Sequence, residues 1–362
     1  MKTDHTDREA AAAETLITRS AEPVNLEMPF STLEDFVTPN EQFYVRCHFP
    51  IPEIAAETWR LQVEGAVDAA LRLTHAELRA MPQHTIMATM ECAGNGRTFL
   101  QPKVKGVAWD LGAVGNGNWS GVLLRDVLDA AGVRDDAIEI ILEGADRGEI
   151  KEPPRPAGEI NYARSLPMNK ACEDVLLALD LNGEPLTPSH GFPLRAVVPG
   201  WYGMASVKWL ERIMVSTTPF HGYYQSIDYV YWTRRDGLPT LVPLSKMPVK
   251  AQVARPVMDE KVPAATTYRV HGAAWGGEGG IAKVELSTDG GGTWSVAEIT
   301  DSAEKNAWRF WEFHWDTPAE PERCTLVVRA TDAHGRTQPR ERVADYGSYM
   351  VNHLLPIEVE IV

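Results

Sequence analysis

Residues 87–100 read MATMECAGNGRTFL, and this stretch is the strongest indication of both fold and function in the chain. Its apolar first half predicts a strand that carries Cys92 into a glycine-rich turn, which Arg97 follows. Glycines let the backbone approach a bulky group closely, and a neighbouring arginine favours a thiolate over a thiol. The alternative without a functional role is that Cys92 is simply packed in the core as a small apolar residue. Phosphate and dinucleotide loops are excluded because their required glycines are missing, so the turn predicts a thiolate presented for metal binding or nucleophilic chemistry.

Composition predicts a soluble globular protein of two domains. The 362 residues are 44% apolar and 23% charged, and this length exceeds what one ordinary core accommodates. No run of 18 apolar residues predicts a membrane-spanning helix. The formal net charge of −15 argues against a nucleic-acid partner, because phosphate binding requires a basic face. A recessed cluster of arginines can still bind a small anion in an acidic protein.

The four cysteines are too widely spread to predict a disulfide scaffold or a zinc site. There is no C-x-x-C and no C-x-x-C-H, so covalent c-type haem is not expected. The first twenty residues contain neither an apolar signal core nor a twin-arginine pair. We therefore expect a reducing compartment, most simply the cytoplasm.

The pattern along the chain predicts three regions. Residues 1–30 are expected to form an arm, with a short helix at about 8–18 and an extended segment after it. Residues 31–248 have a mixed α/β pattern with long loops, which in compact domains usually build a site. Residues 249–362 show short alternating strands and Gly/Asp turns, such as the hairpin signal STDGGGTW at 287–294. This last region predicts a β-sandwich.

Two short helices are predicted within the mixed region. Thr74 with Glu77 three residues later forms a capping-box signal, which opens a helix. A second helix is expected to begin at Ser120 and to end at Gly132. Strands are predicted at 137–144, 192–198 and 206–216.

The segment ECAGNGR, residues 91–97, resembles the cysteine segment of the sulfite oxidase family of molybdenum enzymes, in which this cysteine ligates the metal. Other segments resemble the family in the same order along nearly the whole chain. They are FYVRCHFPIP (43–52), VKGVAW (104–109), EGADR (143–147), HGFPLRAVVPGWYGMASVKWL (190–210), GYYQSIDY (222–229), GAAWGGEGGIAKVELSTDGGGTW (272–294) and WRFWEFHW (308–315). The resemblance implies an α+β catalytic domain of the sulfite oxidase type, followed by an immunoglobulin-like β-sandwich through which two copies form a homodimer.

The resemblance also implies the cofactor, a molybdenum ion held by a pyranopterin dithiolene, with Cys92 as the protein ligand of the metal. A soft thiolate suits this metal. Taken singly, each further cofactor residue could equally be part of a salt bridge, a turn or a core. By resemblance, the cofactor-binding residues are His48, Cys92, Asp146, Ser165, His190, Arg195, Ser206 and Lys208.

The substrate pocket implied by the resemblance lies beside Cys92. Arg46, Arg97 and Tyr229 are expected to orient an oxyanion, since guanidinium groups bind such ions through paired donors. Lys105 and Trp109 are expected to line the same pocket. The family usually has a further arginine near the C-terminus, whereas residues 343–355 here read VADYGSYMVNHLL and contain none.

The expected reaction is oxygen-atom transfer, with sulfite oxidised to sulfate. The chain has neither the C-x-x-C-H motif nor the HPGG haem segment of animal sulfite oxidases. No haem is therefore expected, and the electrons would pass to an external acceptor such as a cytochrome, another protein or oxygen. The alternative enzyme reduces nitrate or an S-oxide with the same fold. A binding protein with a degenerate cofactor domain is a third interpretation, which the retained Cys92, Arg97, His190 and Arg195 argue against.

Overall fold

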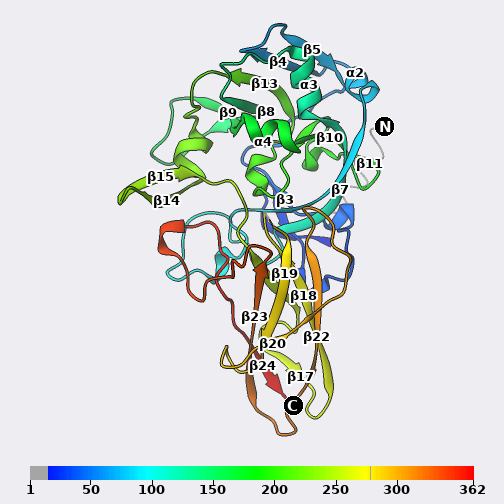
Figure 1. The fold of residues 1–362 in the computed structure, drawn as a ribbon, viewed down its shortest axis with the longest axis vertical. Helices are drawn as coiled ribbons and strands as arrows, with labels where there is room; N and C mark the ends of the chain where they lie inside the picture. The colour runs from blue at the N-terminus through cyan, green and yellow to red at the C-terminus, as the bar shows by residue number, and fades with distance from the viewer. Residues whose placement is uncertain (1–14, 278) are drawn as a thin grey trace.

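The computed structural model describes residues 15–277 and 279–362. Two parts follow one another along the long axis (Figure 1): a larger N-terminal part with most of the helical turns, and a narrower C-terminal β-sandwich. Among the described residues, strands dominate both parts, and the α-helices all lie in the N-terminal part, which agrees with the expected α+β domain followed by a β-sandwich. Within the described residues, no helix combines the length and the apolar character needed to cross a bilayer.

Two sheets form the framework of the N-terminal part. The first has the order β5-β4-β13-β8-β9, in which β13 is parallel to β4 and antiparallel to β8. Its strands are β4 (Arg60–Gly65), β5 (Leu71–Thr74), β8 (Glu139–Glu149), β9 (Glu159–Pro167) and β13 (Leu210–Ser216).

The second sheet has the order β11-β10-β7-β6, with β12 also paired to β10. Its strands are β6 (His84–Glu91), β7 (Val114–Leu123), β10 (Leu176–Leu181), β11 (Glu184–Pro185) and β12 (Arg195–Val197). In the centre of this sheet Gly121 of β7 is required, because a Cβ there would lie 2.0 Å from the Leu177 carbonyl oxygen. β6 lies at one edge of the sheet and delivers Cys92, as the sequence predicted.

The α-helices are short and connect the strands. They are α2 (His75–Ala80), α3 (Leu124–Ala131) and α4 (Met168–Glu173). The capping box at Thr74 and Glu77 is confirmed, since each side chain accepts a backbone N–H of the other residue. The start of the next helix was predicted wrongly. Ser120 belongs to β7, because its segment pairs with β6 and β10, and α3 begins only at Leu124.

Single-turn helices and three short strands complete this part. The turns are η1 (Phe30–Thr32), η2 (Asn40–Gln42), η3 (Arg97–Phe99), η4 (Pro188–His190), η5 (Gly203–Ala205), the π-turn η6 (Tyr224–Asp228) and, near the C-terminus, η7 (Ala344–Tyr346). The strands β1 (Ile17–Ser20), β2 (Asn25–Glu27) and β3 (Val45–Arg46) form a small sheet. Most of the helix expected at 8–18 lies outside the described residues, and Ile17 and Thr18 belong to β1.

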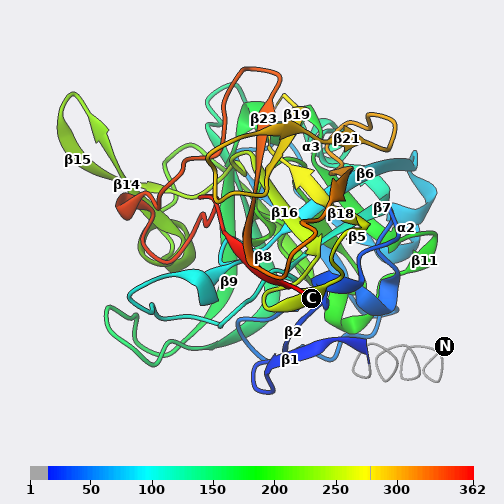
Figure 2. The ribbon, with the colours of Figure 1, turned by 90° about the horizontal axis from the view of Figure 1, so that it is seen from below.

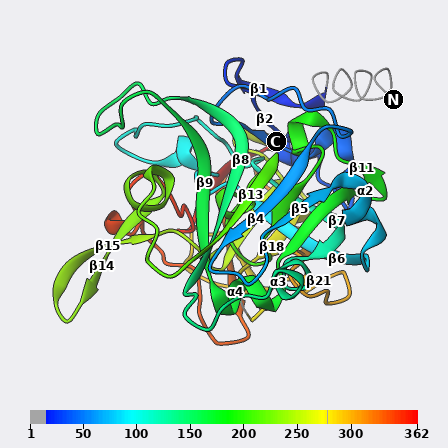
Figure 3. The same ribbon diagram turned by 90° about the horizontal axis from the view of Figure 1, so that it is seen from above.

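A hairpin of β14 (Val230–Arg235) and β15 (Leu238–Pro243) stands away from the body of the molecule (Figures 2 and 3). It begins directly after Tyr229, and Trp232, Leu238 and Leu241 along it are exposed.

The C-terminal part consists of two facing sheets. Their orders are β16-β18-β22-β21 and β17-β24-β23-β19-β20. The strands are β16 (Lys250–Arg255), β17 (Glu260–Val262), β18 (Thr267–Trp275), β19 (Ile281–Ser287), β20 (Ser295–Val296), β21 (Glu298–Ile299), β22 (Arg309–Asp316), β23 (Arg323–Asp332) and β24 (Ile357–Ile361). The predicted hairpin loop joins β19 to β20, and Asp289 accepts hydrogen bonds from the N–H groups of Gly292 and Thr293.

The two parts share one continuous apolar core. Ala273, Trp275 and Trp308 of the sandwich belong to the same cluster of buried side chains as the core of the N-terminal part. A separate core lies between the two sandwich sheets, with Val270, Trp311 and Leu326 among its members. The sandwich is therefore packed directly against the N-terminal part.

Candidate active site

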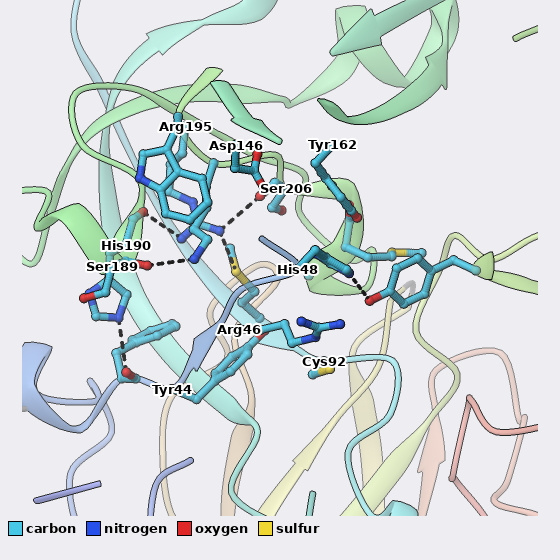
Figure 4. A pocket seen from close by; sticks show the side chains of 17 residues that line it. Tyr44, Arg46, His48, Cys92, Asp146, Tyr162, Ser189, His190, Arg195 and Ser206 are labelled. Atoms are coloured by element: carbon cyan, nitrogen blue, oxygen red, sulfur yellow. Dashed lines mark hydrogen bonds between the residues drawn. The ribbon is translucent and has the colours of Figure 1, made fainter. Parts of the chain in front are cut away.

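A pocket lies among the loops of the N-terminal part (Figure 4). Most of the side chains predicted from the sequence line it. They are Arg46, His48, Cys92, Asp146, His190, Arg195, Ser206, Lys208 and Tyr229. Residues more than 180 positions apart in the sequence therefore meet around one cavity.

Cys92 lies at the carboxyl end of β6, with 6% of its surface exposed. Its backbone N–H donates to the Ala113 carbonyl over 2.9 Å, which fixes the start of the turn. Burial raises the pKa of the Cys92 thiol, and the charges of Arg46 and Arg97 oppose this shift without outweighing it. The arginine effect expected from the sequence is thus present, but the thiol of the cofactor-free chain stays protonated, and a metal ion would displace its proton.

Arg97 supports the turn and does not itself line the pocket. Its Nη1 donates to the Val107 carbonyl over 2.7 Å and its Nε to the Ser348 carbonyl over 3.1 Å. The guanidinium also lies 5.3 Å from the centre of the Tyr349 ring. From outside the pocket, its positive charge still favours the ionised forms of Cys92 and Tyr229.

A cluster of polar and aromatic side chains forms the side of the pocket nearest Tyr229. The Tyr229 hydroxyl and His48 Nε2 are 2.6 Å apart, and Arg46 Nη1 donates to Asn25 Oδ1 over 3.3 Å. Tyr349 lies over Tyr229, with 5.0 Å between ring centres, and donates its hydroxyl proton to Asp228 over 2.5 Å. Burial raises the pKa of Tyr229, so its hydroxyl is a proton donor at neutral pH.

Two cations, the buried Arg195 and the half-buried Lys208, occupy the opposite side of the pocket. Arg195 donates to the carbonyls of His190 and Ser206 over 3.0 and 3.2 Å. Lys208 Nζ donates to the Ser189 carbonyl over 2.8 Å and to Cys47 Sγ over 3.3 Å. Among the described residues, neither cation has a carboxylate within ion-pair distance. Burying unpaired positive charge is costly, so this arrangement fits an anionic ligand group such as a phosphate.

Asp146 and Ser206 offer neutral hydrogen-bonding groups beside these cations. Burial raises the pKa of Asp146 to about 7, although the charges of Lys208 and Arg46 act in the opposite direction. The carboxyl group can therefore carry a proton near neutral pH and donate it to a ligand. Ser206 Oγ accepts the N–H of Val198 over 3.1 Å and keeps its own proton to donate.

His190 is held as a neutral imidazole. Its Nε2 is 3.1 Å from the Phe43 carbonyl, which only accepts, so Nε2 carries the proton. Its Nδ1 then accepts from the Thr187 hydroxyl at 2.9 Å. Burial, with the charges of Arg195 and Lys208, lowers the pKa of His190 to about 3.

Because His190 stays neutral in the folded chain, we expect the cofactor-free protein to lose stability in acid. The unfolded chain binds a proton at the ordinary pKa of 6.5, whereas folded His190 binds it only at about 3. Between these two values, the free energy of unfolding decreases as the pH is lowered, by roughly 1.4 kcal/mol per pH unit for one proton. His190→Gln removes this proton uptake, so the stability difference between the variant and the wild type should narrow on acidification. Urea unfolding at several pH values measures it, and parallel losses in both proteins would contradict the neutral assignment.

Besides Arg97, three further predicted residues lie outside the pocket. Lys105 has an 88% exposed side chain and contacts Glu152, because residues 101–106 form a surface loop. Trp109 is fully buried and packs against Tyr44 in the core around Cys92. Ser165 donates to Glu139 over 3.0 Å. Tyr162 of the same strand lines the pocket, so Ser165, three residues later, lies on the opposite face.

The sequence interpretation missed several pocket residues. Tyr44 and Met90 line the cavity, and strand alternation could have found them, since they lie two residues before Arg46 and Cys92. Tyr162 also lines it, and its ring stacks on His48 with 4.3 Å between ring centres. The sequence had no comparable signal for Tyr162.

Two family models match the chain. The model of the oxidoreductase molybdopterin binding domain matches residues 48–224, and that of the Mo-co oxidoreductase dimerisation domain matches residues 242–361. The division expected at 248/249 falls near the start of the second match and directly before β16.

Relatives of known function resemble the chain over most of its length. Sulfite oxidase of Gallus gallus is 37% identical over 338 residues, which cover 88% of this chain and 72% of that protein. Sulfite oxidase of Arabidopsis thaliana is 33% identical, with 88% and 86% covered. The mitochondrial sulfite oxidase of Rattus norvegicus is 34% identical, and the matched region spans 60% of its length.

Among solved structures, the sulfane dehydrogenase SoxCD from Paracoccus pantotrophus matches with a TM-score of 0.80 and 28% sequence identity. The match covers 94% of this chain and 86% of that one. Fold and sequence comparison thus agree over both parts of the chain.

Proposed function

Because the chain belongs to the sulfite oxidase family of molybdopterin-dependent oxidoreductases, we propose that it oxidises sulfite to sulfate and passes the electrons to an external acceptor. The family's cofactor is molybdenum held by a pyranopterin dithiolene, and when bound it would supply the oxygen-atom and electron transfer. One observation supports the proposal most strongly. A single pocket contains the Cys92 thiol together with two cations, the buried Arg195 and the half-buried Lys208, that have no carboxylate partner in the described part of the chain.

The residues of the pocket divide into two groups. Cys92 would bind the metal, and the cationic side of the pocket would hold the phosphate and polar edge of the pterin. On the other side, Arg46 and the Tyr229 hydroxyl would bind and orient the sulfite oxygens, while His48 fixes the position of that hydroxyl. The rings of Tyr224, which is buried, and Tyr349, which is half-buried, pack around Tyr229 and would limit the access of water to this side.

The test is anaerobic addition of sulfite to protein loaded with molybdenum cofactor. Rapid dye reduction together with a Mo(V) paramagnetic resonance signal is the expected result. A fully loaded protein that sulfite does not reduce would contradict the proposal. Consumption of a reduced dye with nitrate or an S-oxide would then favour the reductase alternative.

A second candidate is oxidation of a less highly charged sulfur substrate, since the structurally similar SoxCD is a sulfane dehydrogenase. Tyr349 favours it, because its ring packs on Tyr229 in the C-terminal segment where the family's arginine was expected. An aromatic ring supplies less charge to an oxyanion than a guanidinium group does. A turnover rate with a thiosulfate or persulfide substrate that exceeds the rate with sulfite would favour this candidate.

Arg46→Met is expected to raise the KM for sulfite much more than it lowers kcat. Loss of a charge-assisted hydrogen bond costs about 1.5–3 kcal/mol, which corresponds to roughly a 10- to 150-fold change in affinity. Steady-state kinetics over a wide range of sulfite concentration measures the effect. Arg147→Met, at a side chain that is 70% exposed, is the matched control and should behave as the wild type. An unchanged KM in Arg46→Met would remove Arg46 from the substrate pocket.

We further propose that the protein is a homodimer and lies in a reducing compartment. The matching dimerisation domain supports a homodimer formed through the C-terminal sandwich. The four cysteines are free, which supports a reducing compartment such as the cytoplasm.

A further inference from the structure

β6 separates the pocket from the C-terminal sandwich. Met90 and Cys92 at its end line the pocket. The alternate residue Thr89 faces the sandwich: its N–H donates to the Asn306 carbonyl over 2.9 Å, and its hydroxyl accepts the Trp308 N–H over 2.6 Å. Because β6 is an edge strand that pairs only with β7 among the described residues, the sandwich contacts a strand edge that another strand would otherwise cover.

Glu91, the residue before Cys92, makes the closest connection to the sandwich. Only 1% of its surface is exposed. Its Oε1 accepts from Lys250 Nζ over 2.8 Å and from Asn95 Nδ2 over 3.1 Å, and its Oε2 accepts from Trp275 Nε1 over 3.0 Å. Lys250 Nζ also donates to the Asn95 carbonyl over 3.3 Å. Lys250 and Trp275 both belong to sandwich strands, β16 and β18.

The contacts continue along the turn beyond Cys92. The Met350 N–H donates to the Ala93 carbonyl over 2.9 Å. Arg97, two residues after Asn95, donates from its Nε to the Ser348 carbonyl. Every second residue from 89 to 97 is therefore bonded to the C-terminal part, whereas Met90 and Cys92 between them face the pocket.

A buried ion pair such as Glu91–Lys250 is not an efficient source of stability, because desolvation offsets most of the attraction. Apolar side chains of similar volume would pack an interdomain contact equally well. The hydrogen bonds to Glu91, however, fix the orientation of its carboxylate and of the backbone that carries it. We propose that Glu91, Lys250 and Trp275 are positioning residues through which the C-terminal sandwich sets the position of Cys92. The inference rests on the role of Cys92 as metal ligand in the proposed function.

The test uses the double variant Glu91→Gln/Lys250→Met, which removes both charges and leaves no lone buried ion. In the cofactor-free chain, the amides of residues 93–97 should exchange hydrogen faster than in the wild type, by about tenfold or more. In the loaded protein, the sulfur-to-molybdenum absorption band should shift. The kcat should fall by about 10- to 100-fold with little change in KM, as for residues that orient a metal ligand.

Arg269→Met is the matched control. Arg269 of β18 also links the sandwich to the N-terminal part, through Glu34, but its side chain is 47% exposed and does not contact β6. It should leave both exchange and absorption unchanged. Trp275→Phe removes the indole N–H to Glu91 together with part of a buried ring, and keeps the Glu91–Lys250 ion pair. It should show the same changes more weakly, and it provides the test if the double variant does not fold.

The inference would be overturned if the double variant exchanged the amides of residues 93–97 at the wild-type rate and kept the wild-type absorption band. If the double variant does not fold, the same result in Trp275→Phe would overturn it. The exchange measurement needs neither cofactor nor substrate. A chain that fails to oxidise sulfite yet shows faster exchange would therefore contradict the proposed function and leave the positioning role intact.

Discussion

Cys92→Ser is expected to fold and to retain the pterin but to lose at least about 99% of its sulfite-oxidising turnover. Changes that merely orient a metal ligand already cost 10- to 100-fold, so loss of the ligand itself should cost more. A serine hydroxyl is close in size to the thiol, so the buried turn should keep its packing. It remains protonated near neutral pH and is a poor ligand for a metal that prefers a soft thiolate. Arg195 and Lys208 are untouched and should still hold the pterin.

The measurement combines steady-state turnover with molybdenum and pterin content per chain. Cys172→Ser is the control, because Cys172 is exposed and lies in α4 outside the pocket. Turnover of Cys92→Ser close to that of the wild type would refute Cys92 as the metal ligand. Loss of folding in this variant would show instead that the thiol has a packing role.

Lys208→Met is expected to change cofactor affinity and protein stability in opposite directions. Lys208 is half-buried, and its ammonium group contacts a carbonyl oxygen, a sulfur atom and the Trp209 ring. Burial lowers the pKa of Lys208, which shows that the charged form is disfavoured when the pocket holds no anion. Methionine has a similar length and no charge. The cofactor-free variant should therefore unfold at a temperature equal to or above that of the wild type.

Cofactor binding should weaken by roughly 10- to 150-fold, since one charge-assisted hydrogen bond contributes about 1.5–3 kcal/mol. Pterin content after dialysis and thermal unfolding of the cofactor-free protein measure the two effects. Lys105→Met, on the surface loop, is the matched control and should change neither. Full pterin retention by Lys208→Met would contradict a cofactor role for this cation.

Local signals in the sequence predicted local structure well. The strand that precedes Cys92, the capping box of α2 and the hairpin loop at Asp289 are each formed by residues close together in the chain. The helix start was wrongly predicted at Ser120 because that prediction also relied on a local signal alone. A serine before an apolar run is a cap signal, but β6 and β10 on either side extend β7 through Ser120, which a single segment does not reveal.

Motif position predicted most of the pocket but not the direction of each side chain. Ser165 lies in β9 beside the pocket, and the pairing of β9 with β8 directs it to the other face. Lys105 was misplaced because the path of a surface loop depends on contacts that the sequence does not encode locally. The contacts of Glu91 with Lys250 and Trp275 span 159 and 184 residues, so no pattern within one segment could have predicted them.

The alternation along β6 also limits which insertions and deletions this chain can tolerate. Adding or removing one residue before position 91, with the strand still paired to β7, would exchange the two faces of the strand end. The Glu91 carboxylate would then enter the pocket in either case, and after a deletion the thiol of Cys92 would take the place of Glu91 beside the ammonium group of Lys250. The spacing between the start of β6 and the turn is therefore expected to be invariant in functional length variants, whereas the loops at 101–106 and 236–237 should accept changes in length.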